Sequence, residues 1–174
     1  MIELVPGHTL RLYDRTPNHW IGHCGPIMVV VLFDGASDDV SHVSVGQRLS
    51  RRLAREFAPK LRLLAVLPPT NARAPSAPLR EALIAAARQS HALFDRVSLC
   101  VESTGFLGAI HRGAATTILT LARPSVPFRV VGTVQEGARF LAPEHPDLAL
   151  ALARACADVA ASMHEPGGHA EAPG

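Results

Sequence analysis

The feature that most constrains this chain is an alternation that begins at Ile27, where short apolar segments of strand length alternate with longer helical patterns. Residues 27–33 form a continuous apolar run, which is typical of a strand buried on both faces. A helix is predicted over about 40–58, because apolar residues recur every four positions there and Pro59 ends the pattern. The residues of that apolar stripe are Val45, Leu49, Leu53 and Phe57.

The same alternation continues to the end of the chain. Further strands are predicted at 61–67, 97–101 and 128–132, and further helices from Ser76 to about Leu93, at about 106–122, after Thr133 and after Pro146. The segment Thr133-Val-Gln-Glu136 is a capping box, which is a specific helix start. The last helix carries one apolar face, made of Leu148, Leu152, Ala155, Val159 and Met163. Strands that alternate with crossover helices indicate an α/β fold with a mainly parallel sheet.

The first 25 residues follow a different pattern. Short strands are predicted at 2–5, 9–13 and 20–24, with turns at Pro6-Gly7 and Gly25-Pro26. They predict an antiparallel hairpin or meander at one edge of the sheet. We expect a single α/β domain over 1–163 and a flexible tail over 164–174.

Composition excludes several classes of protein. With 174 residues, 48% apolar and 18% charged, the chain is not disordered over most of its length. A net charge of +2 without a basic tail argues against nucleic acid as a partner. No run approaches the ~18 apolar residues of a membrane helix, and the N-terminus lacks a signal-peptide pattern, so we expect no transmembrane segment and a cytoplasmic location. The three cysteines are far apart, and Cys100 and Cys156 are expected to be buried thiols.

The chain resembles the small bacterial STAS-like proteins, a group that includes anti-sigma-factor antagonists and related lipid-binding α/β domains. The resemblance rests on 75–80, on Gly105-Phe106 with Arg112 six residues on, and on 127–131 leading into 133–141. It implies a non-enzymatic domain, without a cofactor, that binds a protein partner, a nucleotide or a lipid-like ligand. In antagonist members a serine or threonine at the start of the second helix is phosphorylated; here the matching residue is Ser76, without the neighbouring acidic residue and glycine. As an alternative, Ser76 is the N-cap of that helix.

Ligands of open α/β sheets bind beyond the carboxyl ends of the strands. Three segments are expected to meet there, namely 34–39, 68–75 and 102–105. At the last of these, a strand ends, Gly105 permits a tight turn and a helix begins, so backbone N–H groups could receive an anion. The negative charge of Glu102 would repel an anion at this site unless Glu102 forms an ion pair with Arg80 or Arg112. The residues predicted for ligand or partner binding are Ser76, Arg80, Glu102, Ser103, Thr104, Gly105, Phe106 and Arg112.

Two clusters could bind a metal ion, although each has a simpler interpretation. Acidic residues that could ligate Mg²⁺ with Glu102 also suit the start of a helix; they are Asp34, Asp38 and Asp39. A second cluster consists of His19, Trp20, His23 and Cys24. If that segment is a strand, His19 and His23 lie ~13 Å apart and cannot share one metal. If it is a loop, they could share one, with Cys24 or His8 as a further ligand. A local structural or surface role is the simpler interpretation. We therefore predict no metal site.

An arginine stripe opposite the apolar face of the first helix suits an acidic protein surface or anionic headgroups; its members are Arg48, Arg51, Arg52 and Arg55.

Three functional hypotheses follow. The first is a regulatory protein-interaction module, and the second is a carrier of a small apolar or amphiphilic ligand, lined by Phe106, Leu107 and Ile110. The third is a metal-dependent enzyme. A large apolar cavity favours the carrier, and an exposed apolar patch favours the interaction module. The helix at 148–163 packs on its own domain or pairs with a second copy as a homodimer.

Overall fold

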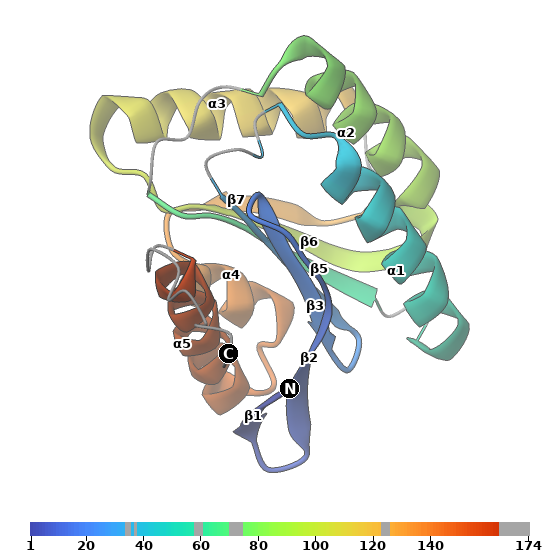
Figure 1. The fold of residues 1–174 in the computed structure, drawn as a ribbon, viewed down its shortest axis with the longest axis vertical. Helices are drawn as coiled ribbons and strands as arrows, with labels where there is room; N and C mark the ends of the chain where they lie inside the picture. The colour runs from blue at the N-terminus through green and yellow to red at the C-terminus, as the bar shows by residue number, and fades with distance from the viewer. Residues whose placement is uncertain (34–35, 37, 58–60, 70–74, 123–125, 164–174) are drawn as a thin grey trace, which may run out of the picture.

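The computed structural model describes residues 1–33, 36, 38–57, 61–69, 75–122 and 126–163, and it shows a mixed sheet with helices on both faces (Figure 1). The sheet has seven strands in chain order, from β1 at one edge to β7 at the other. The strands are β1 (Ile2–Val5), β2 (His8–Arg15), β3 (His19–Cys24), β4 (Ile27–Leu32), β5 (Leu61–Leu67), β6 (Phe94–Val101) and β7 (Phe128–Val131). The predicted α/β class is confirmed.

Strand direction changes at β4. Strands β1 to β4 pair antiparallel through short turns, and β4 to β7 pair parallel through crossover helices. The N-terminal meander predicted from the sequence is therefore confirmed, as is the parallel half of the sheet. The carboxyl ends of the parallel strands β4, β5 and β6 lie at the same end of the sheet, because Val31 pairs with Val66 and Val66 pairs with Cys100.

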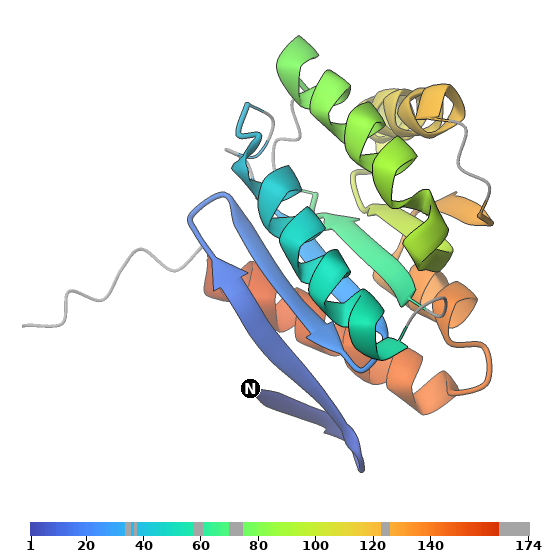
Figure 2. The same ribbon diagram turned by 90° about the vertical axis from the view of Figure 1, so that its right-hand side faces the viewer.

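Helices α1 (Ser41–Phe57), α2 (Ala77–Ser90) and α3 (Gly105–Ala122) lie on one face of the sheet, and α4 (Val134–Leu141) and α5 (Pro146–Ser162) lie on the other (Figures 1 and 2). Three successive right-handed crossovers between neighbouring strands place their helices on the same face. After β7 the chain passes to the opposite face. Thr133 Oγ1 accepts a hydrogen bond from the Glu136 backbone N at 3.2 Å, which confirms the predicted N-cap of α4.

The face under α4 and α5 is closely packed. Side chains of the central strands, such as Val29, Leu64 and Cys100, are fully buried there against both helices. Helix α4 approaches the sheet so closely that a Cβ on Gly137 would lie 2.5 Å from Cys100 Sγ and 2.6 Å from Ser98 Oγ. Burial raises the pKa of Cys100 to about 12, so its thiol stays protonated at neutral pH. Cys24 and Cys156 are also buried free thiols, as predicted for Cys156.

Several boundaries differ from the sequence prediction. Strand β6 begins at Phe94 instead of Val97, because residues 94–96 extend the pairing with β5 beyond the apolar run. Helix α2 ends at Ser90, and a 3₁₀ turn over His91–Leu93 replaces its last predicted turn. The predicted tail at 164–174 lies outside the described residues. Of the helices that the structure describes, none is long and apolar enough to cross a membrane.

Helix α5 packs on its own domain, which decides between the two alternatives for its apolar face. Leu148, Leu152, Ala155 and Val159 are buried in the same core cluster as the sheet residues Leu64 and Val66. Its predicted apolar face is therefore confirmed, and that face is already covered within one chain.

We expect Leu152→Ala to lower the free energy of unfolding by about 2–5 kcal/mol, because it leaves a cavity in this core. Leu150→Ala on the same helix is the matched control, since Leu150 is 38% exposed, and we expect a loss below ~1 kcal/mol. Urea unfolding of both variants measures the difference. Equal losses would show that α5 does not depend on this packing.

Candidate ligand-binding cavity

A cavity of about 280 Å³ lies between the sheet and the helices α1, α2 and α3. Its floor consists of side chains that alternate with those of the α4–α5 core along the same strands. On β5, for example, Leu64 and Val66 are buried under α4 and α5, whereas Leu63, Ala65 and Leu67 face the cavity and are only half-buried. One face of the sheet is thus filled and the other is not.

The cavity exists because the helix faces above it carry small side chains. Helix α1 contributes Gly46, α2 contributes Ala86 and Ala87, and α3 contributes Ala114 and Ala115. The alanines are too short to fill the space above the sheet, and α2 packs mainly on α1 and α3 instead. At Gly46 the helix α1 comes close to the sheet, since a Cβ there would lie 3.2 Å from Met28 Cε. This space is partly open; at roughly 24 cal/mol per Å³, a fully enclosed empty space of the same size would cost on the order of 7 kcal/mol. That is comparable with the whole net stability of a domain, about 5–15 kcal/mol.

The cavity extends to the carboxyl ends of the parallel strands. Phe33 and Ala36 follow β4, Pro68 follows β5, and Pro75 precedes α2; all four line the cavity. The predicted location of a ligand beyond the strand ends is therefore close to the observed cavity. The cavity itself runs further, under the helices.

Two histidines interrupt this apolar lining. His42 in the first turn of α1 is 4% exposed, and His111 in α3 is 6% exposed. Among the described residues, neither ring nitrogen of His42 nor Nδ1 of His111 has a hydrogen-bond partner, although the Asp39 backbone lies close enough to His42 to affect its pKa. A buried polar atom left without a partner costs about 1–3 kcal/mol, so such atoms require an explanation.

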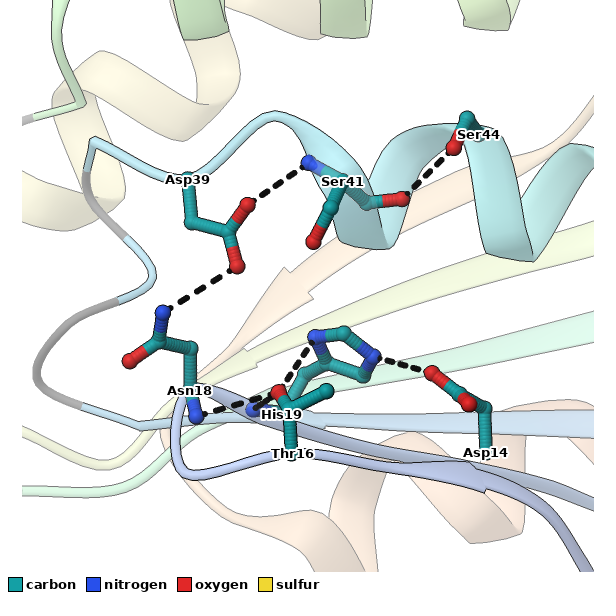
Figure 3. Close-up of polar contacts among 7 residues, drawn as sticks. All are labelled: Asp14, Thr16, Asn18, His19, Asp39, Ser41 and Ser44. Atoms are coloured by element: carbon teal, nitrogen blue, oxygen red, sulfur yellow. Dashed lines mark hydrogen bonds and ion pairs between the residues drawn. The ribbon is translucent and has the colours of Figure 1, made fainter.

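A polar network holds the start of α1 in place (Figure 3). Asp39 Oδ1 accepts a hydrogen bond from the Ser41 backbone N at 2.8 Å, and Asn18 Nδ2 donates to Asp39 Oδ2 at 3.1 Å. Asp39 thereby caps α1, as predicted for the acidic residues before this helix, and connects it to the β2–β3 turn. The Ser41 hydroxyl beside Asp39 is the strongest effect on its carboxylate, and together with the Ser41 backbone N–H and the Asn18 amide it lowers the pKa of Asp39 to about 2.

His19 lies under the same helix start and is fully buried. Its Nε2 lies 2.7 Å from Asp14 Oδ2, and its Nδ1 lies 3.0 Å from Thr16 Oγ1. Thr16 Oγ1 already accepts two backbone N–H groups, so its hydroxyl donates to Nδ1, and Nε2 carries the hydrogen that Asp14 accepts. The His42 ring packs at 6.1 Å from the His19 ring, centroid to centroid. The hydrogen bonds that hold the His19 ring therefore also help to fix the position of the His42 ring, which packs against it.

Burial lowers the pKa of His42 from its usual 6.5, and nearby His19 lowers it further, while Asp39 opposes the shift. His42 is therefore neutral at pH 7. A neutral imidazole donates one hydrogen bond and accepts another.

None of the residues predicted for ligand or partner binding lines this cavity. Ser76 lies at the start of α2, where its Oγ accepts a hydrogen bond from the Leu79 backbone N at 3.4 Å, as expected for an N-cap. Arg80 and Thr104 are exposed.

The turn between β6 and α3 is as tight as predicted. Gly105 has φ +65°, a backbone conformation that favours glycine. Ser103 is buried, and its Oγ has no hydrogen-bond partner among the described residues, so it does not cap α3. Arg112 Nη1 donates to the Ser103 carbonyl at 3.1 Å and forms no ion pair with Glu102.

The cavity lining expected from α3 is corrected by the structure. Phe106 is 81% exposed and Ile110 is 43% exposed, so both side chains lie on the outer face of the helix. The side of α3 that faces the cavity is a different one, and it carries His111, Ala114, Ala115 and Ile118. The side chain of Leu107, the third expected residue, lies outside the described part of the chain.

The residues considered for metal binding are not brought together where the structure describes them. His19, Trp20, His23 and Cys24 lie along strand β3, and the His23 Nδ1 atom lies 3.3 Å from the Gly25 carbonyl oxygen. Within the described residues, no group of three or more His, Cys, Asp or Glu side chains could hold a metal ion. Asp34 lies outside the described residues.

The arginine stripe is placed as expected. Arg48, Arg51, Arg52 and Arg55 are all exposed on α1, opposite its buried residues Val45, Leu49 and Leu53.

Sequence reasoning missed His42 and His111. The available signal was helical phase: His42 lies three residues before Val45 in the apolar stripe of α1, and His111 lies four residues before Ala115. A polar residue within an apolar stripe is buried with it, and a buried polar residue needs a partner.

The fold and cavity define a mixed-sheet α/β protein with a ligand-sized space on one face of the sheet. Comparison with known proteins adds no identification, since no family model, no curated protein and no solved structure matches the chain.

The lowered pKa of His42 predicts a pH dependence of stability. Unfolded His42 binds a proton near pH 6.5, whereas folded His42 binds one only at lower pH. Its contribution to stability is thus present above pH ~6.5 and is lost as the pH falls below that value. We expect His42→Phe to flatten the fall in unfolding free energy between pH 7.5 and 5.5, as measured by urea titration. His145→Phe, at an exposed histidine, is the control, and an unchanged slope in His42→Phe contradicts the prediction.

Proposed function

We propose that this protein binds and carries a small, mainly apolar molecule in the cavity between the sheet and α1–α3. The observation that carries the proposal is the difference between the two sheet faces: the described side chains of one are closely packed, and the other leaves about 280 Å³ under three helices. The large apolar cavity that would favour a carrier over an interaction module is present.

The size of the ligand follows from the volume. An engineered apolar cavity of about 150 Å³ binds benzene, which has six non-hydrogen atoms. By proportion, the observed 280 Å³ holds roughly ten to twelve. Naphthalene, with ten carbon atoms, is therefore a suitable probe. At about 0.5–0.7 kcal/mol per atom, we expect a Kd on the order of 10–100 µM.

We expect Ala86→Phe to abolish naphthalene binding, because the added ring extends into the cavity from α2. Ala85→Phe is the matched control, since Ala85 is the neighbouring residue and is exposed on the same helix. Naphthalene fluorescence titration measures both Kd values, and urea unfolding confirms that both variants fold. The proposal is wrong if Ala86→Phe still binds naphthalene, or if the wild-type protein does not bind it.

A natural ligand can be sought directly. Native mass spectrometry of protein purified without added ligand is expected to show a bound mass that Ala86→Phe lacks and Ala85→Phe retains.

A second candidate function is a STAS-like regulatory interaction module, supported by an exposed apolar pair on α3. Phe106 and Ile110 lie one turn apart on the outer face of the helix and are 81% and 43% exposed. Such side chains suit the surface of a protein partner. In this hypothesis, binding at the cavity and binding at α3 are separate properties.

We expect a double variant, Phe106→Ser with Ile110→Ser, to lose any protein partner that the wild type captures, while it keeps naphthalene affinity. Ala109→Ser, at an exposed position between the two, is the control. Pull-down with the three proteins compares them, and a partner retained by the double variant would remove this surface from consideration.

A further inference from the structure

The cavity has a polar part and an apolar part. Its polar part is at the helix starts, where α1 and α3 leave the carboxyl ends of β4 and β6 and carry His42 and His111 in their first halves. Toward the amino ends of β5 and β6, the lining consists of apolar side chains such as Leu63, Phe94 and Val97. A ligand that matches this lining is amphiphilic.

The other hydrogen-bonding side chains of α1 in the lining are already engaged. Ser50 Oγ donates to the Gln47 carbonyl at 3.0 Å, and Gln47 Nε2 donates to Gln89 Oε1 at 3.1 Å. The two imidazoles are different: among the described residues, neither ring nitrogen of His42 nor Nδ1 of His111 has a hydrogen-bond partner. Both side chains are more than nine-tenths buried and line the cavity. The Asp39 backbone lies near one nitrogen of His42, so each ring offers at least one nitrogen to a ligand.

Charge determines which polar group suits these nitrogens. Among the described lining residues there is no Lys, Arg, Asp or Glu. A carboxylate or an ammonium group buried here would lack a counter-charge, which is costly in an apolar space. A hydroxyl or carbonyl oxygen needs only hydrogen bonds, and a neutral imidazole donates one and accepts one.

We propose that the ligand is an uncharged amphiphile whose hydroxyl or carbonyl oxygen is hydrogen-bonded by His42 and His111, with its apolar body over β5 and β6. This inference rests on the proposed carrier function and adds the chemical class of the ligand. It also explains why two histidines are buried in a lining that is mostly apolar.

Three probes of nearly equal size separate the possible ligand classes. Naphthalene is a hydrocarbon, 1-naphthol adds a hydroxyl, and 1-naphthoate adds a carboxylate. We expect the affinity ratio of 1-naphthol to naphthalene to fall roughly tenfold in His42→Phe and in His111→Phe, because each substitution removes hydrogen-bonding nitrogens. Naphthalene affinity itself is expected to change little, which shows that the cavity persists in each variant.

His145→Phe is the matched control, since His145 is exposed and does not line the cavity; its ratio is expected to equal that of the wild type. An unchanged ratio in both cavity variants overturns the inference, and so does 1-naphthoate binding more tightly than 1-naphthol. If naphthalene does not bind the wild type, the carrier proposal itself fails, so the two failures are distinguishable.

A second readout requires no substitution and covers the case in which a variant does not fold. In ¹⁵N NMR spectra of histidine-labelled wild-type protein, 1-naphthol is expected to shift the ring nitrogens of His42 and His111. Naphthalene is expected to shift them much less. Equal shifts with both probes mean that the oxygen makes no hydrogen bond to these rings, which also overturns the inference.

Discussion

The packing of α4 and α5 against one face of the sheet is the interaction on which the rest of the structure depends. It buries the central strands through residues such as Leu64, Val66 and Cys100, together with Leu141 and Leu152 of the helices. This core contains most of the large apolar side chains that the structure buries completely. Because one face of the sheet is held so firmly, the opposite face does not need to be filled for the domain to fold.

The opposite face of the sheet is packed less completely. Helix α1 packs on β3 and β4 through Val45, Leu49 and Leu53, whereas more than half of the α2 and α3 residues that line the cavity are alanines or a serine. The helices therefore cover a volume that their own side chains do not occupy. In the proposed carrier function, this volume holds a molecule that the chain itself does not supply.

Polar groups at the start of α1 determine which ligand chemistry the proposed site would select. The capping contact of Asp39, its link to Asn18 and the buried His19 ring together fix the first turn of α1, and with it the position of His42. In the proposed function, an imidazole held in this way is arranged for a group from outside the chain. Under that proposal, stability and ligand recognition are divided between the two faces of one sheet.

The sequence by itself determined the order of the elements, because the periods of apolar residues and the turn residues are local signals. The run at 27–33, the stripe of α1 and the capping box at Thr133 each predicted an element that the structure contains. Local signals do not show how far a helix stands from a sheet, so only the tertiary structure decided that one face is filled and the other hollow. For the same reason Phe106 and Ile110 were expected inside and lie outside. Burial of His42 and His111 depends on the phase of each helix against its neighbours, which is settled only when the helices pack.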